Sequence, residues 1–222
     1  IQDFEKIIQD GYVYVDKTDL VYKLANEGHV YFLSRPRRFG KSLLVSTLKY
    51  YFQGRKDLFK GLAIDSLETE WKEYPVFHLS FGTSNYTKSD SLDDVIEKYL
   101  SKFEEEYHIS AKRKDYGFRL QEVLHAAHKK TGLRAVVLID EYDKPLLDVL
   151  DTNYKGVQDG QELPLEEINR NILKGFYSVF KDADQDLQFV LLTGVTKFSQ
   201  VSVFSGFNQP DDISLNSDYE SL

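Results

Sequence analysis

The chain has 222 residues, 41% of them hydrophobic, which is enough for a substantial folded core. It contains no cysteine, so disulfides and thiolate zinc sites are excluded. Its net charge of −8 gives no overall attraction for nucleic acid or anionic membranes. The apolar runs are far shorter than the ~20 residues of a membrane span, and the acidic start of the sequence lacks a signal-peptide core. We therefore expect a cytoplasmic protein without membrane contact, and nucleic-acid binding is not supported.

Short apolar runs alternate with helical patterns along the chain. In chain order, the expected elements are a helix near 18–27, a strand at 29–34, a helix at 41–53, short helical turns within 55–73, a strand at 74–81, helices at 89–107 and 116–131, a strand at 134–140, a polar surface loop at 151–164, a helix at 165–182 and a strand at 187–193. This alternation predicts an α/β fold with a mostly parallel central sheet flanked by helices. The alternative is an open sheet in which 74–81 pairs elsewhere. Ligands of such sheets bind at the carboxyl ends of the strands.

The loop after the first expected strand, R-P-R-R-F-G-K-S at 35–42, carries the clearest chemical signal. Gly40-Lys41-Ser42 ends the pattern G-x-x-x-x-G-K-[S/T], although Arg35 stands where the first glycine is usual. In such a loop the backbone N–H groups and the following helix start hold phosphates, the lysine reaches the β- and γ-phosphates, and the hydroxyl residue binds Mg²⁺. The candidate nucleotide-binding residues are Arg35, Pro36, Arg37, Arg38, Phe39, Gly40, Lys41, Ser42 and Leu43. The alternative is a basic turn that faces solvent.

A second candidate segment follows the most apolar strand. Asp140 and Glu141 come directly after a run of apolar residues, the arrangement of a Walker B strand. There the aspartate, with Ser42, orders the magnesium shell, and the glutamate activates the attacking water as a general base. The alternative is a pair of acids that begins a helix or a solvated loop. Combined with the upstream loop and one strand between them, the pattern favours the branch of P-loop NTPases with an additional strand and a catalytic glutamate.

Further polar residues have weaker signals. Thr193, at the end of the fourth expected strand, would lie between the two motifs if that branch's strand order holds, and could then hold the attacking water or sense the γ-phosphate. The alternative is a threonine that merely closes the strand, with Thr196 and Lys197 as other candidates for that role. His125 and His128 are spaced i,i+3 on a helix without an evident third metal ligand, which favours an exposed or partly buried helical pair over a metal site.

Five segments together resemble the bacterial AAA-ATPase-like family of predicted ATPases. They are YVDKTDLVYKL, FLSRPRRFGKSLLVSTL, YPVFHLSF, VVLIDEYDKPLL and LLTGVTKFSQVSVFSGFNQPDDIS. The resemblance covers nearly the whole chain and implies that 1–222 form one AAA-like P-loop ATPase domain, that arginine at 35 is the family's form of the loop, and that the ligands are ATP and Mg²⁺. Family members usually continue into a nuclease-like domain of the PD-(D/E)XK type. Nothing here matches that domain, so we expect a chain truncated before it, and neither a fifth strand nor a second sensor is evident.

The expected function is Mg²⁺-dependent ATP hydrolysis coupled to a conformational switch or motor. Lys41, Glu141 and Thr193 are the expected catalytic residues. One alternative is a nucleotide-gated interaction module that binds ATP with little or no turnover. Another is a basic loop that contacts nucleic acid, which the net charge of −8 disfavours. The sequence leaves the oligomeric state open, a homo-oligomer included, and the choice of adenine rests on the resemblance alone.

Overall fold

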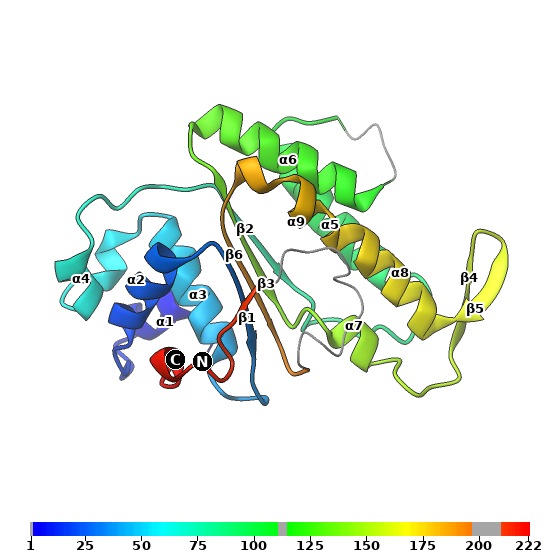
Figure 1. The fold of residues 1–222 in the computed structure, drawn as a ribbon, viewed down its shortest axis with the longest axis horizontal. Coiled ribbons are helices and arrows are strands. Elements are labelled where there is room, and N and C mark those ends of the chain that lie inside the picture. Colours follow the sequence, from blue (N-terminus) through cyan, green and yellow to red (C-terminus); the bar gives the residue numbers. More distant parts are fainter. Residues whose placement is uncertain (1, 111–114, 197–209) are drawn as a thin grey trace.

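The computed structural model describes residues 2–110, 115–196 and 210–222, which are organised around a parallel β-sheet (Figure 1). The sheet has five strands in the order β2-β3-β6-β1-β7, and every neighbouring pair is parallel. The strands are β1 (Val30–Ser34), β2 (Val76–Ser80), β3 (Ala135–Asp140), β6 (Leu187–Gly194) and β7 (Asp211–Asp212). The predicted α/β fold is thus confirmed, and strand 74–81 belongs to the same sheet as the others, next to β3.

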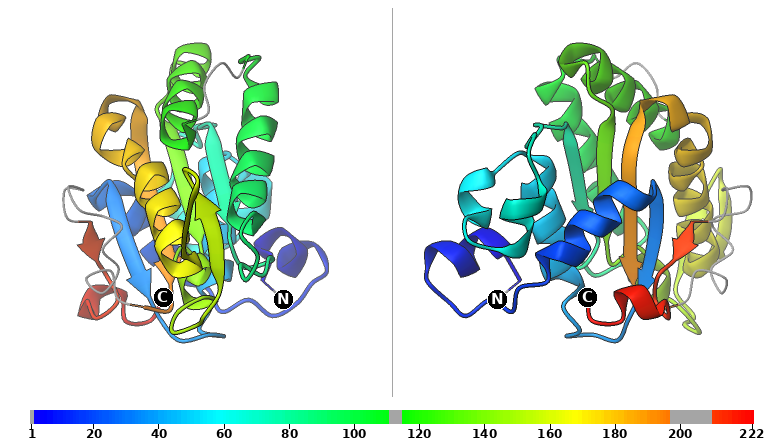
Figure 2. Two further views of the ribbon diagram at one scale, coloured as in Figure 1. Left: turned by 90° about the vertical axis from the view of Figure 1, so that its right-hand side faces the viewer. Right: turned by 60° about the vertical axis from the view of Figure 1, so that its left-hand side comes forward.

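Helices cover both faces of this sheet (Figures 1 and 2). One face carries α1 (Phe4–Gln9), α2 (Thr18–Glu27), α3 (Lys41–Phe52), a 3₁₀ turn (Lys56–Phe59) and α4 (Ala63–Leu67). The other carries α5 (Ser91–Glu106), α6 (Tyr116–Thr131), α8 (Leu165–Tyr177) and α9 (Val179–Asp182), with the short α7 (Lys144–Leu147) below them in Figure 1. The apolar periodicity of α8, α5 and α2 explains this arrangement, because each helix buries one stripe against the sheet.

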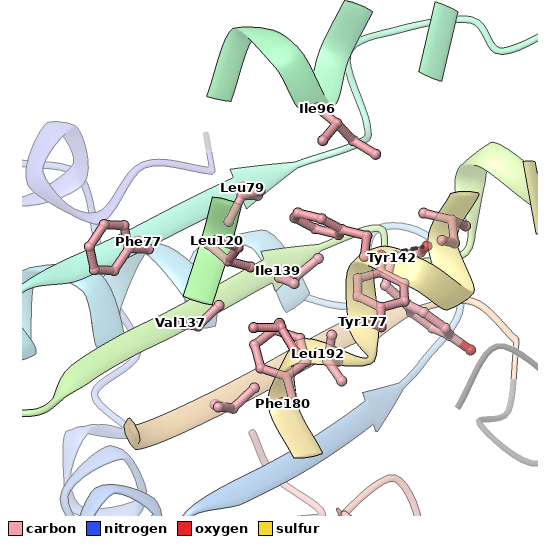
Figure 3. Packing of buried hydrophobic residues seen from close by; sticks show 14 of the residues in the cluster. Phe77, Leu79, Ile96, Leu120, Val137, Ile139, Tyr142, Tyr177, Phe180 and Leu192 are labelled. Atoms are coloured by element: carbon pink, nitrogen blue, oxygen red, sulfur yellow. Dashed lines mark hydrogen bonds between the residues drawn. The ribbon is translucent and has the colours of Figure 1, made fainter. Parts of the chain in front are cut away.

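The central strands are apolar on both faces because both faces are covered. In β3, Val136 and Leu138 pack in the layer of α1–α4, whereas Val137 and Ile139 pack in the opposite layer. Figure 3 shows Val137 and Ile139 in that second layer, with Tyr142 close to them. All six residues of β3 are buried, which is why its sequence reads as a nearly continuous apolar run.

The segment predicted as a polar loop at 151–164 is instead a β-hairpin. Strands β4 (Lys155–Gln158) and β5 (Gln161–Pro164) pair antiparallel and project from the body beyond α8 (Figure 1). Asp159 and Gly160 connect them with φ of 52° and 79°. Positive φ at both positions is the two-residue hairpin turn that an Asp-Gly pair favours, so the sequence contained the signal that the loop prediction overlooked.

Two further expectations were wrong. The helix predicted over 165–182 is divided, because α8 ends at Tyr177 and the four-residue α9 starts at Val179. A fifth strand is present after all, since β7 pairs with β1 through Tyr31↔Asp211 and Phe32↔Asp212. A strand of two residues has no periodicity, so only its pairing partner makes it recognisable.

Candidate nucleotide-binding site

The carboxyl ends of β1, β3 and β6 meet at the lower edge of the sheet in Figure 1. Because β6 lies between β1 and β3, its last residues touch both neighbours. Thr193 donates its hydroxyl to Asp140 Oδ1 at 2.6 Å, and the Gly194 carbonyl accepts the Arg35 N–H at 3.1 Å. Thr193 was expected to lie between the two motifs only if β6 lies between β1 and β3. The observed strand order meets that condition.

The loop of residues 35–40 leads directly into α3. Gly40, the residue before the helix, has φ of +78°, a left-handed conformation that glycine adopts without steric strain. The side chain of Lys41 turns back over the loop, and its Nζ donates to the carbonyls of Arg35 and Pro36 at 2.7 and 2.8 Å. Burial lowers the pKa of the Lys41 ammonium, while the carboxylates of Asp140 and Glu141 oppose that shift.

The beginning of α3 is open to a ligand. None of the described side chains caps it, because Gly40 occupies the cap position. The first N–H groups of a helix have no partner within the helix, and they carry its positive dipole end. A cavity of about 440 Å³ lies at this end, lined by Gln2, Arg37, Arg38, Gly40, Lys41, Ser42, Leu43, Glu141 and Val195. This combination of uncapped N–H groups and cationic side chains suits a polyphosphate.

Three predicted loop residues do not line that cavity. The Arg35 guanidinium donates to the carbonyls of Tyr219 and Glu220, at 2.9 and 3.2 Å, and so contacts the end of the described chain. Pro36 contributes its carbonyl to Lys41, and the Phe39 ring is 58% exposed. The residue that replaces the usual first glycine thus has a structural contact of its own.

The acidic residues occupy two levels of the site. Asp140 and Thr193 are buried and bonded to each other, whereas Glu141 reaches the cavity. Burial raises the pKa of the Glu141 carboxyl, and the Asp140 charge raises it further, while Lys144 and Arg37 oppose the shift. Glu141 has φ of +53°, uncommon for a residue with a side chain. Such backbone strain is frequent where a functional group must be held in place.

Gly82 makes room for Glu141 in a way that the sequence prediction missed. A β-carbon at Gly82 would lie 2.9 Å from Glu141 Cδ and 3.0 Å from both of its carboxylate oxygens. The glycine lies two residues after the end of β2, at the same sheet edge as the other site residues. Its position after a strand was the available signal.

Asp143 is a second residue that the sequence prediction missed. Its Oδ2 accepts the backbone N–H groups of Val195 and Thr196 at 3.0 and 2.7 Å, and the Thr196 hydroxyl at 2.6 Å. The side chain is fully buried. Its place two residues after Glu141 was the only hint in the sequence. Lys197, the other fallback candidate, lies outside the described residues.

A smaller apolar cavity of about 240 Å³ adjoins the first one. The two cavities share Gly40 and Leu43 as lining residues. Most of its wall comes from the segment before α2 and from α3, and α1, α2 and the end of the described chain contribute Ile7, Val21 and Leu222. An apolar hollow beside a phosphate-type site has the character that a flat, weakly polar ring system requires.

The histidine pair lies far from these cavities and has a structural partner. Nδ1 of His128 lies 2.8 Å from Asp186 Oδ1, and Nδ1 of His125 lies 3.3 Å from the same carboxylate. Within 2–110, 115–196 and 210–222, no cluster of three or more acidic or histidine side chains is arranged to hold a metal ion. The side chains of His125 and His128 are 62% and 34% exposed, as expected for an exposed or partly buried helical pair.

The parallel sheet, the glycine-led start of α3 and the acidic end of β3 define an α/β protein with a P-loop NTPase-like fold. The family model described as "Predicted AAA-ATPase" matches residues 1–204, and the chain belongs to that family. Membership in a family of predicted ATPases suggests ATP binding. None of the helices in the described ranges has both the length and the apolar character that crossing a bilayer requires.

One curated relative is similar along the whole chain. It is the "Uncharacterized protein in vnfD 5'region" of Azotobacter chroococcum mcd 1, 42% identical over 226 aligned residues. The alignment covers 100% of this chain and 41% of the relative, so the chain spans about two fifths of that protein's length. No solved structure matches the chain.

Proposed function

We propose that this chain binds ATP with Mg²⁺ and hydrolyses it, and that the nucleotide state alters the loops at the sheet edge. The uncapped start of α3, with Lys41 and Glu141 at the same cavity, carries the proposal. The β- and γ-phosphates would lie against the N–H groups that begin α3. Lys41 Nζ, held by two loop carbonyls, is within reach of that position and would exchange them for phosphate oxygens.

The adenine base would occupy the apolar cavity beside Gly40 and Leu43. The lining by Val13, Val15 and Leu44 supports burial of a ring system, and the shared residues make the two cavities contiguous along one ligand. Val13 and Val15 are 94% and 70% exposed, so ring binding would remove apolar surface from water. Base preference thus depends on the segment before α2 rather than on the phosphate loop.

Ser42 and Asp140 are the proposed magnesium ligands. A hydroxyl and a carboxylate are the hard oxygen donors that Mg²⁺ prefers, and Asp140 has only one of its oxygens engaged by Thr193. Bound Mg²⁺ would neutralise charge on the β- and γ-phosphates during transfer.

Glu141 is the proposed general base. Its carboxylate would accept a proton from water while the water oxygen attacks the γ-phosphorus and the bond to the β–γ bridging oxygen breaks, which gives ADP and phosphate. The raised pKa of Glu141, caused by burial and by the Asp140 charge, makes it a stronger base than an exposed glutamate. Thr193, which is hydrogen-bonded to Asp140, would transmit the presence or absence of the γ-phosphate to β6.

Glu141→Gln tests the proposal. We expect the wild type to bind ATP in the presence of Mg²⁺ and release phosphate. The variant should bind ATP with similar affinity and lose turnover, on the order of 100-fold or more. Glu105→Gln, at an exposed position of α5, is the matched control and should behave as the wild type. If wild type and variant both bind ATP and neither releases phosphate, the protein is a nucleotide-gated binding module instead.

A further inference from the structure

The carboxylate of Asp143 connects the segment after β3 to the segment after β6. One oxygen, Oδ2, accepts three hydrogen bonds, from the Val195 and Thr196 N–H groups and from the Thr196 hydroxyl. Asp143 is 1% exposed, so these bonds form away from water. Bonds of N–H and O–H groups to a buried carboxylate are among the stronger hydrogen bonds in proteins.

The same two segments are joined by further hydrogen bonds, including a long one of 3.4 Å from the Tyr142 hydroxyl to the Thr196 carbonyl. Thr193 donates its hydroxyl to Asp140, and the Tyr142 N–H donates to the Thr193 carbonyl at 2.9 Å. Residues 140–143 and 193–196 therefore lie side by side in a fixed register. Val195, in the second segment, lines the same cavity as Glu141 in the first. The relative position of the two segments thus determines the shape of the cavity next to Glu141.

Asp143 and Tyr142 pack closely against β6 at Gly194. A β-carbon on Gly194 would lie 2.8 Å from Asp143 Oδ1, and also within 2.3 and 2.5 Å of two Tyr142 ring atoms. The carboxylate therefore approaches β6 more closely than any other residue at 194 would permit. Tyr142 is itself fixed, since its carbonyl accepts the Tyr177 hydroxyl at 3.2 Å, and the two rings lie close together in Figure 3.

The two oxygens of the Asp143 carboxyl group differ in their surroundings. Asp143 Oδ1 is buried and has no hydrogen-bond partner among the described residues. A buried carboxyl oxygen without a partner carries a desolvation cost that no hydrogen bond offsets. A group that carries this penalty beside a candidate active site is better explained by a role in the site than by a role in the core.

We infer that Asp143 is a positioning residue for ATP turnover, an inference that rests on the proposed function. It holds residues 195 and 196 against the loop that carries Glu141, and it does not itself contact the nucleotide. Loss of the carboxylate would release the Val195 wall and allow Glu141 to leave its left-handed conformation. Misplacement of a catalytic group by about 1 Å lowers turnover by up to about 100-fold. ATP binding depends on the other wall, at α3, and is retained.

The test compares Asp143→Ala and Asp143→Asn with Asp148→Ala. Asp148 is a matched control in the segment that follows α7, where its carboxylate accepts from Lys144 Nζ at 2.6 Å and from the Tyr86 N–H at 3.2 Å. None of these three groups holds residues 195 and 196. Asp143→Asn keeps one acceptor oxygen and serves as the conservative rescue, and it also covers the case in which the alanine variant does not fold.

Two measurements are made on each variant. The first is steady-state ATP turnover with a separate ATP titration. We expect Asp143→Ala to lower kcat about 10- to 100-fold with the ATP affinity changed by less than about threefold, and Asp143→Asn to fall between it and wild type. The second is amide hydrogen exchange without nucleotide. Exchange at Val195 and Thr196 should accelerate about tenfold or more in Asp143→Ala and stay unchanged in Asp148→Ala.

The outcomes are separable. Unchanged kcat in Asp143→Ala would overturn the inference, as would an equal loss of kcat in Asp148→Ala, because that pattern follows general destabilisation. Loss of ATP binding together with kcat would also overturn it, because Asp143 would then be part of the binding site. If the wild type itself does not hydrolyse ATP, the proposed function fails, whereas accelerated exchange limited to Val195 and Thr196 would still support the positional part.

Discussion

Replacing Lys41 with alanine should remove most of the ATP affinity, whereas replacing Arg35 with alanine should leave it within about fivefold, or under ~1 kcal/mol. Both residues belong to the basic loop, but their contacts differ. Lys41 Nζ lies at the loop carbonyls beside the cavity, while the Arg35 guanidinium binds the carbonyls of Tyr219 and Glu220. Lys41 can therefore turn its ammonium group toward a bound phosphate without losing a contact to the end of the described chain. Arg35 would have to give up its bonds to Tyr219 and Glu220 to do the same.

The expected magnitudes follow from these contacts. A hydrogen bond to a charged group contributes about 1.5–3 kcal/mol, so Lys41→Ala should weaken ATP binding roughly ten- to 150-fold. Arg35→Ala should instead lower the free energy of unfolding by about 1–3 kcal/mol, since two bonds to backbone carbonyls are lost. In a chain of 222 residues, each kcal/mol corresponds to about 2–4 °C in the unfolding midpoint.

The assay is an ATP titration by calorimetry in the presence of Mg²⁺, with thermal unfolding of the same samples. Lys49→Ala is the control, because Lys49 belongs to the same helix and its Nζ lies over the Tyr50 ring, 4.9 Å from the centroid. It should bind ATP as the wild type does. The reasoning is refuted if Arg35→Ala weakens ATP binding more than Lys41→Ala. The loop would then hold its ligand by the charge of Arg35, and the Gly-Lys-Ser sequence would not mark the phosphate site.

Gly40→Ala should lower the free energy of unfolding by about 1–2 kcal/mol, because alanine is strained in the left-handed conformation, and it should also weaken ATP binding. Gly132→Ala is the control, since Gly132 has φ of +72° and equally free space around its α-carbon. It should lower only the free energy of unfolding. Equal ATP affinity in the two variants, measured by titration, would contradict a phosphate contact at Gly40. Arg119→Ala should cost about 3–5 kcal/mol in urea denaturation, because it strands the buried Glu104 carboxylate, whereas Glu97→Gln at a half-exposed partner should cost at most about 1 kcal/mol. The hydrogen bond from Arg119 lowers the pKa of Glu97, so this carboxylate stabilises the fold above the ordinary glutamate range and loses that effect as the pH falls through its folded pKa. The stability difference between wild type and Glu97→Gln should therefore shrink as the pH falls from neutral to below the ordinary glutamate pKa of about 4.3, and a difference that grows there would refute the ion-pair assignment.

Much of the fold could be predicted because its signals are local. The apolar runs at β1, β3 and β6 follow directly from burial on both faces, so their bounds agree with prediction to within one or two residues. The order of strand, basic loop and helix at 29–53 has the same origin, since Gly40 and the helical spacing after it lie within a few residues of each other. The placement of Thr193 between the two motifs was also predicted, although through the strand order of a known branch rather than through any local pattern.

The remaining features depend on contacts between residues far apart in the sequence. Strand β7 exists because Asp211 and Asp212 meet β1 some 180 positions earlier, and no two-residue segment signals such pairing. The contact of the Arg35 guanidinium with the carbonyls of Tyr219 and Glu220 likewise joins residues far apart in the sequence. Such contacts join residues far apart in the sequence, so no local pattern indicates them.

The same distinction separates the chemistry of the site from its geometry. The residue types at 40–42 and 140–141 carry their chemistry in the sequence itself, because charge, hydroxyl groups and missing side chains belong to single residues. Gly82 and Asp143 acquire their roles only from what lies opposite them, the Glu141 carboxylate in one case and the backbone of Val195 and Thr196 in the other. A glycine after a strand or a buried aspartate is ambiguous by itself. Tertiary packing decides its role, since it alone sets which groups come within 3 Å of each other.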